Sequence, residues 1–267
     1  MSLARRIRVF RALTRVGAAE ALAYRAEVVT WLLSTTMPLV MAAFFAALAR
    51  DRPVGRLGER EVGAYFLATF IVRTVTGSFV SRQINLEIRD GTLATRLMRP
   101  VHPLLAYTAE TLGAFPTRLT VVVPAAVAFA AIFGGQGLAR DPAAGPMFAL
   151  ALAGAWALSL LVSFVIGALA FYVDQSDKVM DAYLTGLFVL SGYLVPLELF
   201  PPSLRGALDW LPFRYQIGLP VEILVGAHAR GEAMALLARQ WAMIAVAAAL
   251  ARALWRRGVA RFAAYGG

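Results

Sequence analysis

Residues 191–226 read SGYLVPLELFPPSLRGALDWLPFRYQIGLPVEILVG, and this apolar, proline-rich stretch decides how the chain folds. Each proline lacks an N–H and clashes with the preceding helical turn, so the stretch cannot form one membrane-spanning helix and is predicted to fold into short helical pieces. Irregular backbone at membrane depth occurs only where protein or a water-filled cavity covers it. We therefore predict that residues 196–228 form a re-entrant helical hairpin, an outer gate that closes one end of a pathway. Its gate residues are Pro196, Phe200, Pro201, Pro212, Phe213 and Pro220.

An interfacial loop that carries a belt of aromatic side chains is the alternative interpretation of this stretch. Phe200, Trp210 and Tyr215 would then lie at the level of the lipid headgroups.

The composition of the whole chain is that of a membrane protein. Of its 267 residues, 60% are hydrophobic and only 16% are charged, and the mean hydropathy is +0.67. We expect one integral membrane domain, residues 1–267. The absence of cysteine excludes disulfides, thiolate metal sites and cysteine nucleophiles. The net charge of +10 indicates loops that face anionic lipid rather than a nucleic-acid partner.

The hydrophobic pattern predicts an all-α integral membrane fold with six transmembrane helices, since about 20 apolar residues cross a bilayer. The six predicted spans are residues 28–49, 62–80, 104–133, 147–173, 179–196 and 233–252. If the N-terminus is cytoplasmic, the cytoplasmic segments hold 15 basic residues and the outer segments hold eight. The positive-inside rule thus favours two cytoplasmic termini, although arginines 50, 52, 56 and 60 run against it.

The N-terminal residues 1–27 are predicted to form an amphipathic helix at the cytoplasmic interface. Apolar side chains recur at helical spacing from Leu3 to Leu13, and arginines occupy the rest of the helix. The residues assigned to this interface helix are Arg5, Arg8, Phe10 and Arg11. An unstructured basic arm is the alternative.

Residues 81–103, between the second and third predicted spans, form a second informative segment. Leucine and isoleucine alternate with charged residues at helical spacing, Asp90-Gly91 interrupts the run, and a second short turn ends at Pro100. A short amphipathic element on the cytoplasmic side is a plausible docking site for another protein. The alternative is an ordinary solvated basic loop.

The chain resembles the ABC-2 type permeases, the membrane subunits of ATP-binding-cassette exporters, and most closely a subfamily of about 260 residues that ends in Gly-Gly. The resemblance is carried by the motifs Ser-Gly-Tyr-Leu-Val-Pro-Leu, Leu-Phe-Pro-Pro, Leu-Pro-Phe-Arg-Tyr and Pro-Val-Glu-Ile-Leu-Val-Gly, and by the final Gly266-Gly267. It implies that residues 81–103 hold the coupling helix that sits in a groove of the ATPase. The matching positions are Glu87, Arg89, Asp90, Gly91, Leu93, Arg99 and Pro100.

The resemblance also implies the partners and the location: two copies of a cytoplasmic ATPase, a second permease subunit that is identical or related, membrane lipid, and the bacterial plasma membrane. The chain has no P-loop of its own, because its single lysine, Lys178, lies in Gln-Ser-Asp-Lys-Val-Met. We therefore expect no enzyme activity and no bound cofactor in this chain. ATP and magnesium belong to the partner ATPase.

Charged residues inside predicted spans are costly and usually functional. Arg73 and Glu110 lie at similar depths, about 12 Å and about 9 Å from the cytoplasmic ends of their spans at ~1.5 Å per residue. We predict that they form an ion pair between the second and third spans, with a proton relay as the alternative. His102 and His228 belong to no ligand pattern, and the aspartates at 174, 177 and 181 are typical of a helix cap, so no metal site is expected.

The predicted function is that of a permease subunit in an ATP-driven exporter of a hydrophobic or amphipathic substrate: a lipid, a glycolipid, a drug or a peptide. Two alternatives remain, an intramembrane enzyme that acts on a lipid and an ion-coupled secondary transporter. The sequence does not present the clustered carboxylates or histidines of such an enzyme. Small residues at 159, 163 and 167 in the fourth span predict a close helix-packing seam, within the subunit or, as the alternative, at a dimer interface.

Overall fold

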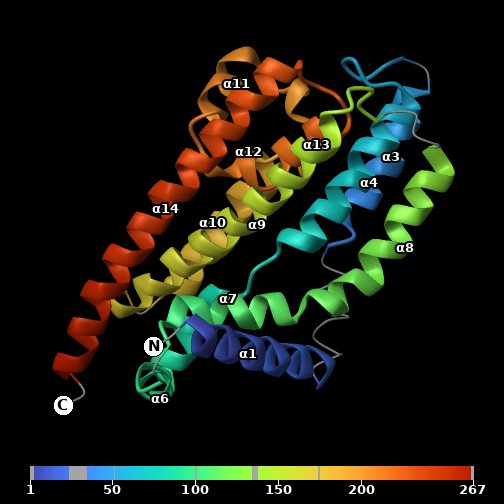
Figure 1. Cartoon of the computed structure of the whole chain (residues 1–267). Helices are drawn as coiled ribbons and strands as arrows, with labels where there is room; N and C mark the ends of the chain where they lie inside the picture. Colours follow the sequence, from blue (N-terminus) through green and yellow to red (C-terminus); the bar gives the residue numbers. More distant parts are fainter. Residues whose placement is uncertain are drawn as a thin grey trace.

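The computed structural model describes residues 3–23, 35–50, 52–99, 101–133, 138–173 and 175–265, and these residues form helices joined by turns, with no β-strand among them (Figure 1). The first half contains α1 (Leu3–Ala23), α3 (Met37–Ala49), α4 (Glu59–Thr76), α5 (Val80–Arg89), α6 (Leu93–Leu97), α7 (Pro103–Gly113) and α8 (Phe115–Phe133). The second half contains α9 (Ala144–Ala168), η1 (Leu169–Phe171), α10 (Ser176–Leu190), η2 (Leu197–Leu199), α11 (Pro202–Leu208), α12 (Pro212–Gln216), α13 (Gly218–Leu224) and α14 (Arg230–Tyr265).

The long helices form a bundle, and α1, α6 and α7 lie together at its lower end (Figure 1), which we call the foot. In Figure 1 the long helices α4, α8, α9 and α14 run from top to bottom, whereas α1 and α7 lie across the lower end beside α6. The short helices α11, α12 and α13 lie at the upper end. Both ends of the described chain are at the foot. The sequence segments proposed for coupling and for gating are therefore at opposite ends of the molecule.

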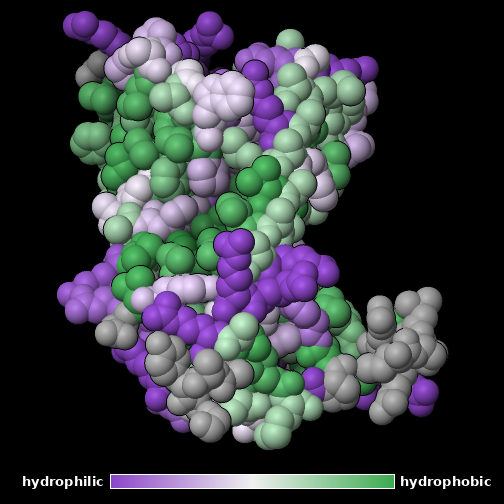
Figure 2. Space-filling view, turned by 90° about the vertical axis from the view of Figure 1, so that its left-hand side faces the viewer, coloured by the Kyte–Doolittle hydropathy of each residue, from purple (hydrophilic) through white to green (hydrophobic). Residues whose placement is uncertain are grey.

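Three helical segments are long and apolar enough to cross a membrane: Glu59–Arg89, Ala144–Phe171 and Arg230–Phe262. A fourth crossing results if Pro103–Gly113 and Phe115–Ala128, which meet at 42°, count as one broken span. Helices α3 and α10 are shorter, with 13 and 15 residues. The all-helical membrane fold is thus confirmed, and six spans stay a prediction; residues 28–34 of the first predicted span lie outside the described residues. Figure 2 shows a broad apolar band over the upper half of one face, with hydrophilic residues above and below it.

Helix α9 forms the centre of the bundle and packs against α14, α5, α13 and α12. Its small residues do form a packing seam within the subunit, as predicted. The backbone N–H of Ser81, in α5, donates to the Ser163 hydroxyl at 3.0 Å. A Cβ on Gly167 would lie 3.0 Å from the Cα of Ser81, so glycine permits the close approach of the two helices. The start of α5 is therefore fixed on α9.

The proline-rich stretch folds into short helices, as predicted from its sequence. Helices α11 and α12 each begin at a proline, Pro202 and Pro212. Proline costs no hydrogen bond there, because the first N–H groups of a helix have no acceptor within the helix. Gly192, with φ of 88°, makes the turn after α10, and its carbonyl accepts a hydrogen bond from the Tyr65 hydroxyl at 2.9 Å. This contact ties the turn to α4.

Most of this stretch is covered by protein. The side chains of Tyr193, Tyr215, Ile217 and Leu219 are at most 2% exposed. Of the predicted gate residues, Pro196 and Pro220 are buried, Phe200, Pro212 and Phe213 are partly buried, and Pro201 is exposed. Only α11 and the turn at Trp210 present much surface. The coverage meets the physical requirement for broken backbone in a membrane.

Candidate functional site

The turn between α5 and α6 is built by its sequence. Helix α5 ends at Arg89, Asp90 caps it, and Gly91 has φ of 71°, a left-handed conformation that glycine adopts without strain. The chain thereby reverses into α6, which has only five residues. Leu93, the first residue of α6, is fully buried in the main core. Leu93 therefore anchors the start of this short helix in the core, and the partly buried Leu97 packs against the same core.

An ionic cluster connects α6 with α5 and α7, and Arg96 lies at its centre. The Arg96 guanidinium donates to both carboxylate oxygens of Glu87, with distances from 2.6 to 3.0 Å, and to Glu110 at 2.8 Å. It also stacks on the ring of Tyr107, 4.2 Å from the centroid. The Tyr107 hydroxyl donates to Glu87 at 2.5 Å, and the Gln83 amide donates to Glu110 at 3.0 Å.

This Arg96 cluster is largely removed from water. The charged side chains of Arg96, Glu87 and Glu110 are 11%, 15% and 12% exposed. Burial alone would lower the pKa of Arg96, but hydrogen bonds to Glu110 and Glu87 outweigh it and raise the pKa above its usual range. Two carboxylates share one guanidinium, so the fork geometry of arginine satisfies both. The cluster fixes α6 against its two neighbours.

The predicted ion pair between Arg73 and Glu110 is wrong. Glu110 binds Arg96 and Gln83, whereas Arg73 lies against the ring of Phe188, 5.5 Å from its centroid. Equal depth does not decide which face of a helix a side chain occupies. Glu110 faces the foot of the molecule, where α6 supplies its counter-charge.

The residues predicted for coupling divide into an inner and an outer group. Glu87 and Leu93 point inward, the first into the Arg96 cluster and the second into the core. Asp90, Gly91 and Arg99 are exposed, and Pro100 lies outside the described residues. Arg89 is exposed and lies 3.5 Å from Asp177 in the first turn of α10; Asp174 lies outside the described residues. The exposed group is the part of the turn that a partner can reach.

Two apolar side chains add to this exposed surface. Leu86, in α5, is 50% exposed and Met98, after α6, is 78% exposed. Leu86 and Asp90 are four residues apart and share a face of α5. We call the exposed residues Leu86, Asp90, Gly91, Met98 and Arg99 the coupling surface. Exposed leucine and methionine beside charged groups are typical of a protein-binding surface.

Residues 59–266 match the family described as ABC-2 family transporter protein, which is 208 of the 267 residues. The chain belongs to this family. The resemblance inferred from the proline-rich motifs and the coupling segment is thereby confirmed. The chain is accordingly a membrane protein of a transporter family. No curated protein matches the sequence significantly.

In this ABC-2 transporter protein, α1 crosses α7 at two glycines. A Cβ on Gly17 would lie 2.5 Å from the carbonyl oxygen of Glu110, and a Cβ on Gly113 would lie 2.8 Å from the backbone N of Ala18 and would overlap the carbonyl of Thr14. Only glycine permits two helix backbones to approach so closely. Sequence analysis missed this crossing, although isolated glycines in helical segments were a signal for it.

The predicted interface helix exists as α1, but its packed face differs from the predicted apolar stripe. Ile7 and Val16 are about half exposed, and the buried position is Gly17. Arg8 and Arg11 are exposed and Phe10 is partly buried, as an interfacial helix requires. The side chain of Arg5 lies outside the described part of the chain.

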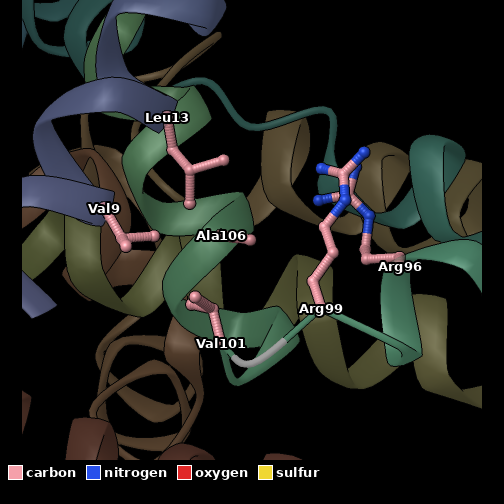
Figure 3. A pocket seen from close by; sticks show the side chains of 6 residues that line it. All are labelled: Val9, Leu13, Arg96, Arg99, Val101 and Ala106. Carbon is pink, nitrogen blue, oxygen red and sulfur yellow. The ribbon is translucent and has the colours of Figure 1, made fainter. Parts of the chain in front are cut away.

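A pocket of about 190 Å³ lies between α1, α7 and the segment that follows α6. Figure 3 shows Val9 and Leu13 entering it from α1 and Ala106 from α7. The side chains of Arg96 and Arg99 point the same way in this view. Because Arg96 already binds two carboxylates, the pocket is the apolar seam behind the Arg96 cluster, and we assign it no ligand.

A second ionic cluster holds the proline-rich helices at the opposite end of this ABC-2 protein. Arg214, in α12, donates to Glu222 in α13 at 2.9 Å and also binds Asp209. His228 lies 3.0 Å from Glu222 and 3.0 Å from Glu232, the latter in α14. Sequence analysis treated His228 as a lone residue; its partners are four to 14 residues away and come together only through the fold.

We expect the stability of the protein to decrease as the pH rises above about 6.5, the pKa of histidine in an unfolded chain. Burial lowers the pKa of His228, but the hydrogen bonds and charges of Glu222 and Glu232 outweigh burial and raise the pKa. Arg214 also faces the ring, at 3.1 Å. A raised pKa means that the stabilisation is complete below the unfolded value and is lost as the pH passes the folded value.

The thermal midpoint of the purified chain, measured from pH 5.5 to pH 9, tests this expectation. The midpoint should fall by a few degrees in the wild type, and His228→Gln should remove most of that fall. His102→Gln is the matched control, since the second histidine caps α7 at the foot. An unchanged pH profile in His228→Gln would contradict the assignment.

Proposed function

We propose that this chain is the permease subunit of an ATP-driven exporter, and that a separate ATPase docks on the coupling surface. The observation that supports the proposal best is the turn at Gly91, which is fixed from behind by the Arg96 cluster and presents Leu86 and Met98 outward. A docking site must transmit force, so it needs rigid support as well as exposed contacts. Membership of the ABC-2 family supplies the reason to expect an ATPase there.

The proposed assembly contains two permease subunits, identical or related, and two ATPase copies in the bacterial plasma membrane. Both ends of the described chain lie at the same end of the molecule as α6 (Figure 1), which supports a cytoplasmic location for the foot and both termini. ATP-driven closure of the ATPases would push on α6 and, through the α1–α7 crossing, on α1. The movement would open a path whose outer gate is the α11–α13 segment.

The substrate in this proposal is hydrophobic or amphipathic, in keeping with the apolar spans, and it moves outward. Helix α8 carries exposed Val123 and Val127, and α14 carries exposed Val246 and Leu250. Such faces are suited to lipid or to an apolar substrate.

Affinity purification of the tagged chain from its native host, in mild detergent, tests the proposal. A soluble P-loop ATPase should co-purify with the wild type. Met98→Asp places a charge in the contact and should reduce recovery at least about tenfold, as the loss of one interface hot spot does. Leu204→Asp, which changes a partly exposed leucine at the opposite end, is the matched control and should leave recovery unchanged.

Two results would overturn the proposal. The first is purification of the chain without any ATPase, even after crosslinking. The second is an equal loss of ATPase in Met98→Asp and in Leu204→Asp, because this would mean that the substitution acts through folding rather than through docking.

A further inference from the structure

Arg73 is a cation without a counter-ion in the described structure. It lies in the last turn of α4 and is partly buried, and its Nε atom is buried without a hydrogen-bond partner. None of the described carboxylates forms an ion pair with it, since Glu110 is held by Arg96. A charged side chain within a membrane span is costly and is usually retained for a function.

The surroundings of Arg73 offer further hydrogen-bond donors with no acceptor. Tyr193 is 2% exposed, its hydroxyl has no partner, and its ring stacks on Phe188 at 4.9 Å. Phe188 is the ring over which the Arg73 guanidinium lies. The hydroxyl of Thr76, one turn after Arg73 in α4, is also buried without a partner. Buried polar groups of native proteins are nearly always satisfied, so this concentration calls for a missing acceptor.

A second arginine adds positive charge in the same region. Arg118, in the first turn of α8, is 7% exposed and lies within electrostatic range of Arg73. Its NH1 donates to the carbonyl of Val75 at 2.7 Å, which satisfies one free carbonyl at the C-terminus of α4. The partial negative charge of a helix C-terminus, about half an elementary charge, does not balance the Arg73 guanidinium.

We propose that Arg73, with the hydroxyl of Tyr193, binds a phosphate or carboxylate group of the molecule that this chain moves. The proposal rests on the proposed permease function and narrows its substrate to an anionic amphiphile. Arg73 lies in the last turn of α4, and the start of α8 contacts this turn through the hydrogen bond from Arg118 to the Val75 carbonyl. An acidic headgroup bound at Arg73 would leave its apolar tail among the long helices.

Arginine and tyrosine suit this role chemically. Charge-assisted hydrogen bonds from guanidinium to phosphate or carboxylate are short and strong, and the planar fork adds geometric selectivity. The Phe188 ring under the guanidinium fixes its orientation before a ligand binds, which reduces the entropic cost of binding. The site should therefore distinguish anionic from cationic and neutral headgroups.

Binding of dodecyl phosphate to the purified full-length chain, in nanodiscs of zwitterionic phosphatidylcholine, tests the proposal. Calorimetric titration should show that Arg73→Gln lowers the affinity at least about tenfold, the usual loss when one partner of a buried charged contact is removed. Arg73→Lys should retain more affinity, and Tyr193→Phe should lose about threefold. Arg205→Gln, which changes an exposed arginine in α11, is the control and should bind as the wild type does.

Competition identifies the source of the anionic group. If inorganic phosphate displaces dodecyl phosphate, the site binds a free anion. If only dodecanoate displaces it, the site recognises the headgroup of an amphiphile. Either result supports an anion site at Arg73, whereas only the second supports an anionic amphiphile as the substrate. Equal binding by wild type and Arg73→Gln would overturn it, as would equal binding of dodecyltrimethylammonium.

Two further outcomes are informative. If Arg73→Gln does not fold, Tyr193→Phe and Arg73→Lys decide the matter, and unchanged affinity in both would refute the site. A different result is that Arg73→Gln separates two permease subunits while the wild type binds no dodecyl phosphate. In that case Arg73 pairs with an acidic residue of the second subunit, and the anion site is refuted. Recovery of the ATPase does not depend on Arg73, so the permease proposal is judged independently.

Discussion

Replacing Arg96 with glutamine should destabilise the protein by about 3 kcal/mol and abolish ATPase recovery. The reason is that Glu87 and Glu110, which are 15% and 12% exposed, would lose the cation that both of them bind. Removal of one partner from a largely buried ion pair leaves an uncompensated charge, and losses of roughly 3–5 kcal/mol are typical. Denaturant unfolding of the purified chain and ATPase co-purification measure the two effects.

Two further variants serve as controls for this prediction. Arg99→Gln removes an exposed arginine three residues away and should change stability by less than about 0.5 kcal/mol. Neutralising both carboxylates together with Arg96, in the triple variant Glu87→Gln, Arg96→Gln, Glu110→Gln, should recover part of the lost stability. An Arg96→Gln chain as stable as Arg99→Gln would show that the cluster does not support α6.

Replacing Gly113 with alanine should separate α1 from α7. The new Cβ would overlap backbone atoms of Thr14 and Ala18, which cannot move aside as a flexible side chain would. Overpacking of this kind costs about 1–3 kcal/mol. Trypsin cleavage at Arg8 and Arg11 should therefore become faster, and thermal stability should fall.

Gly206→Ala is the matched control, because a Cβ at position 206 meets no atom within 4 Å. In an exposed helix that change should stabilise by about 0.5–1 kcal/mol. Gly113→Ala and Gly206→Ala thus differ in sign although the substitution is the same. A stabilised Gly113→Ala chain would mean that the α1–α7 crossing is looser than the structure shows.

The proline-rich stretch could be predicted because proline acts on its own backbone. Pro202 and Pro212 start α11 and α12 whatever surrounds them, and Gly91 allows the turn into α6 for the same local reason. Each of these prolines and glycines lies within a few residues of the helix start or turn that it determines. The family resemblance rested on the same segments, and it was confirmed.

The Arg96 cluster could not be found in the same way. Arg96 is nine residues from Glu87 and 14 from Glu110, separations that no helical periodicity connects. The prediction paired Glu110 with Arg73 because their depths agreed, but Glu110 faces α6, where Arg96 binds it, and α7 and α8 meet at a 42° bend. The hydrophobic pattern of residues 104–133 encodes neither this bend nor the close approach of α1 and α7 at Gly17 and Gly113.

Helix α14 has 36 residues, and the spacing of its arginines has a consequence for the surrounding lipid. From Arg239 to Arg252 the helix rises only about 20 Å at ~1.5 Å per residue. The hydrocarbon layer of a typical bilayer is about 30 Å thick. Long arginine side chains recover part of the difference by reaching outward, and the remainder is hydrophobic mismatch. The bilayer beside α14 should therefore be thinned.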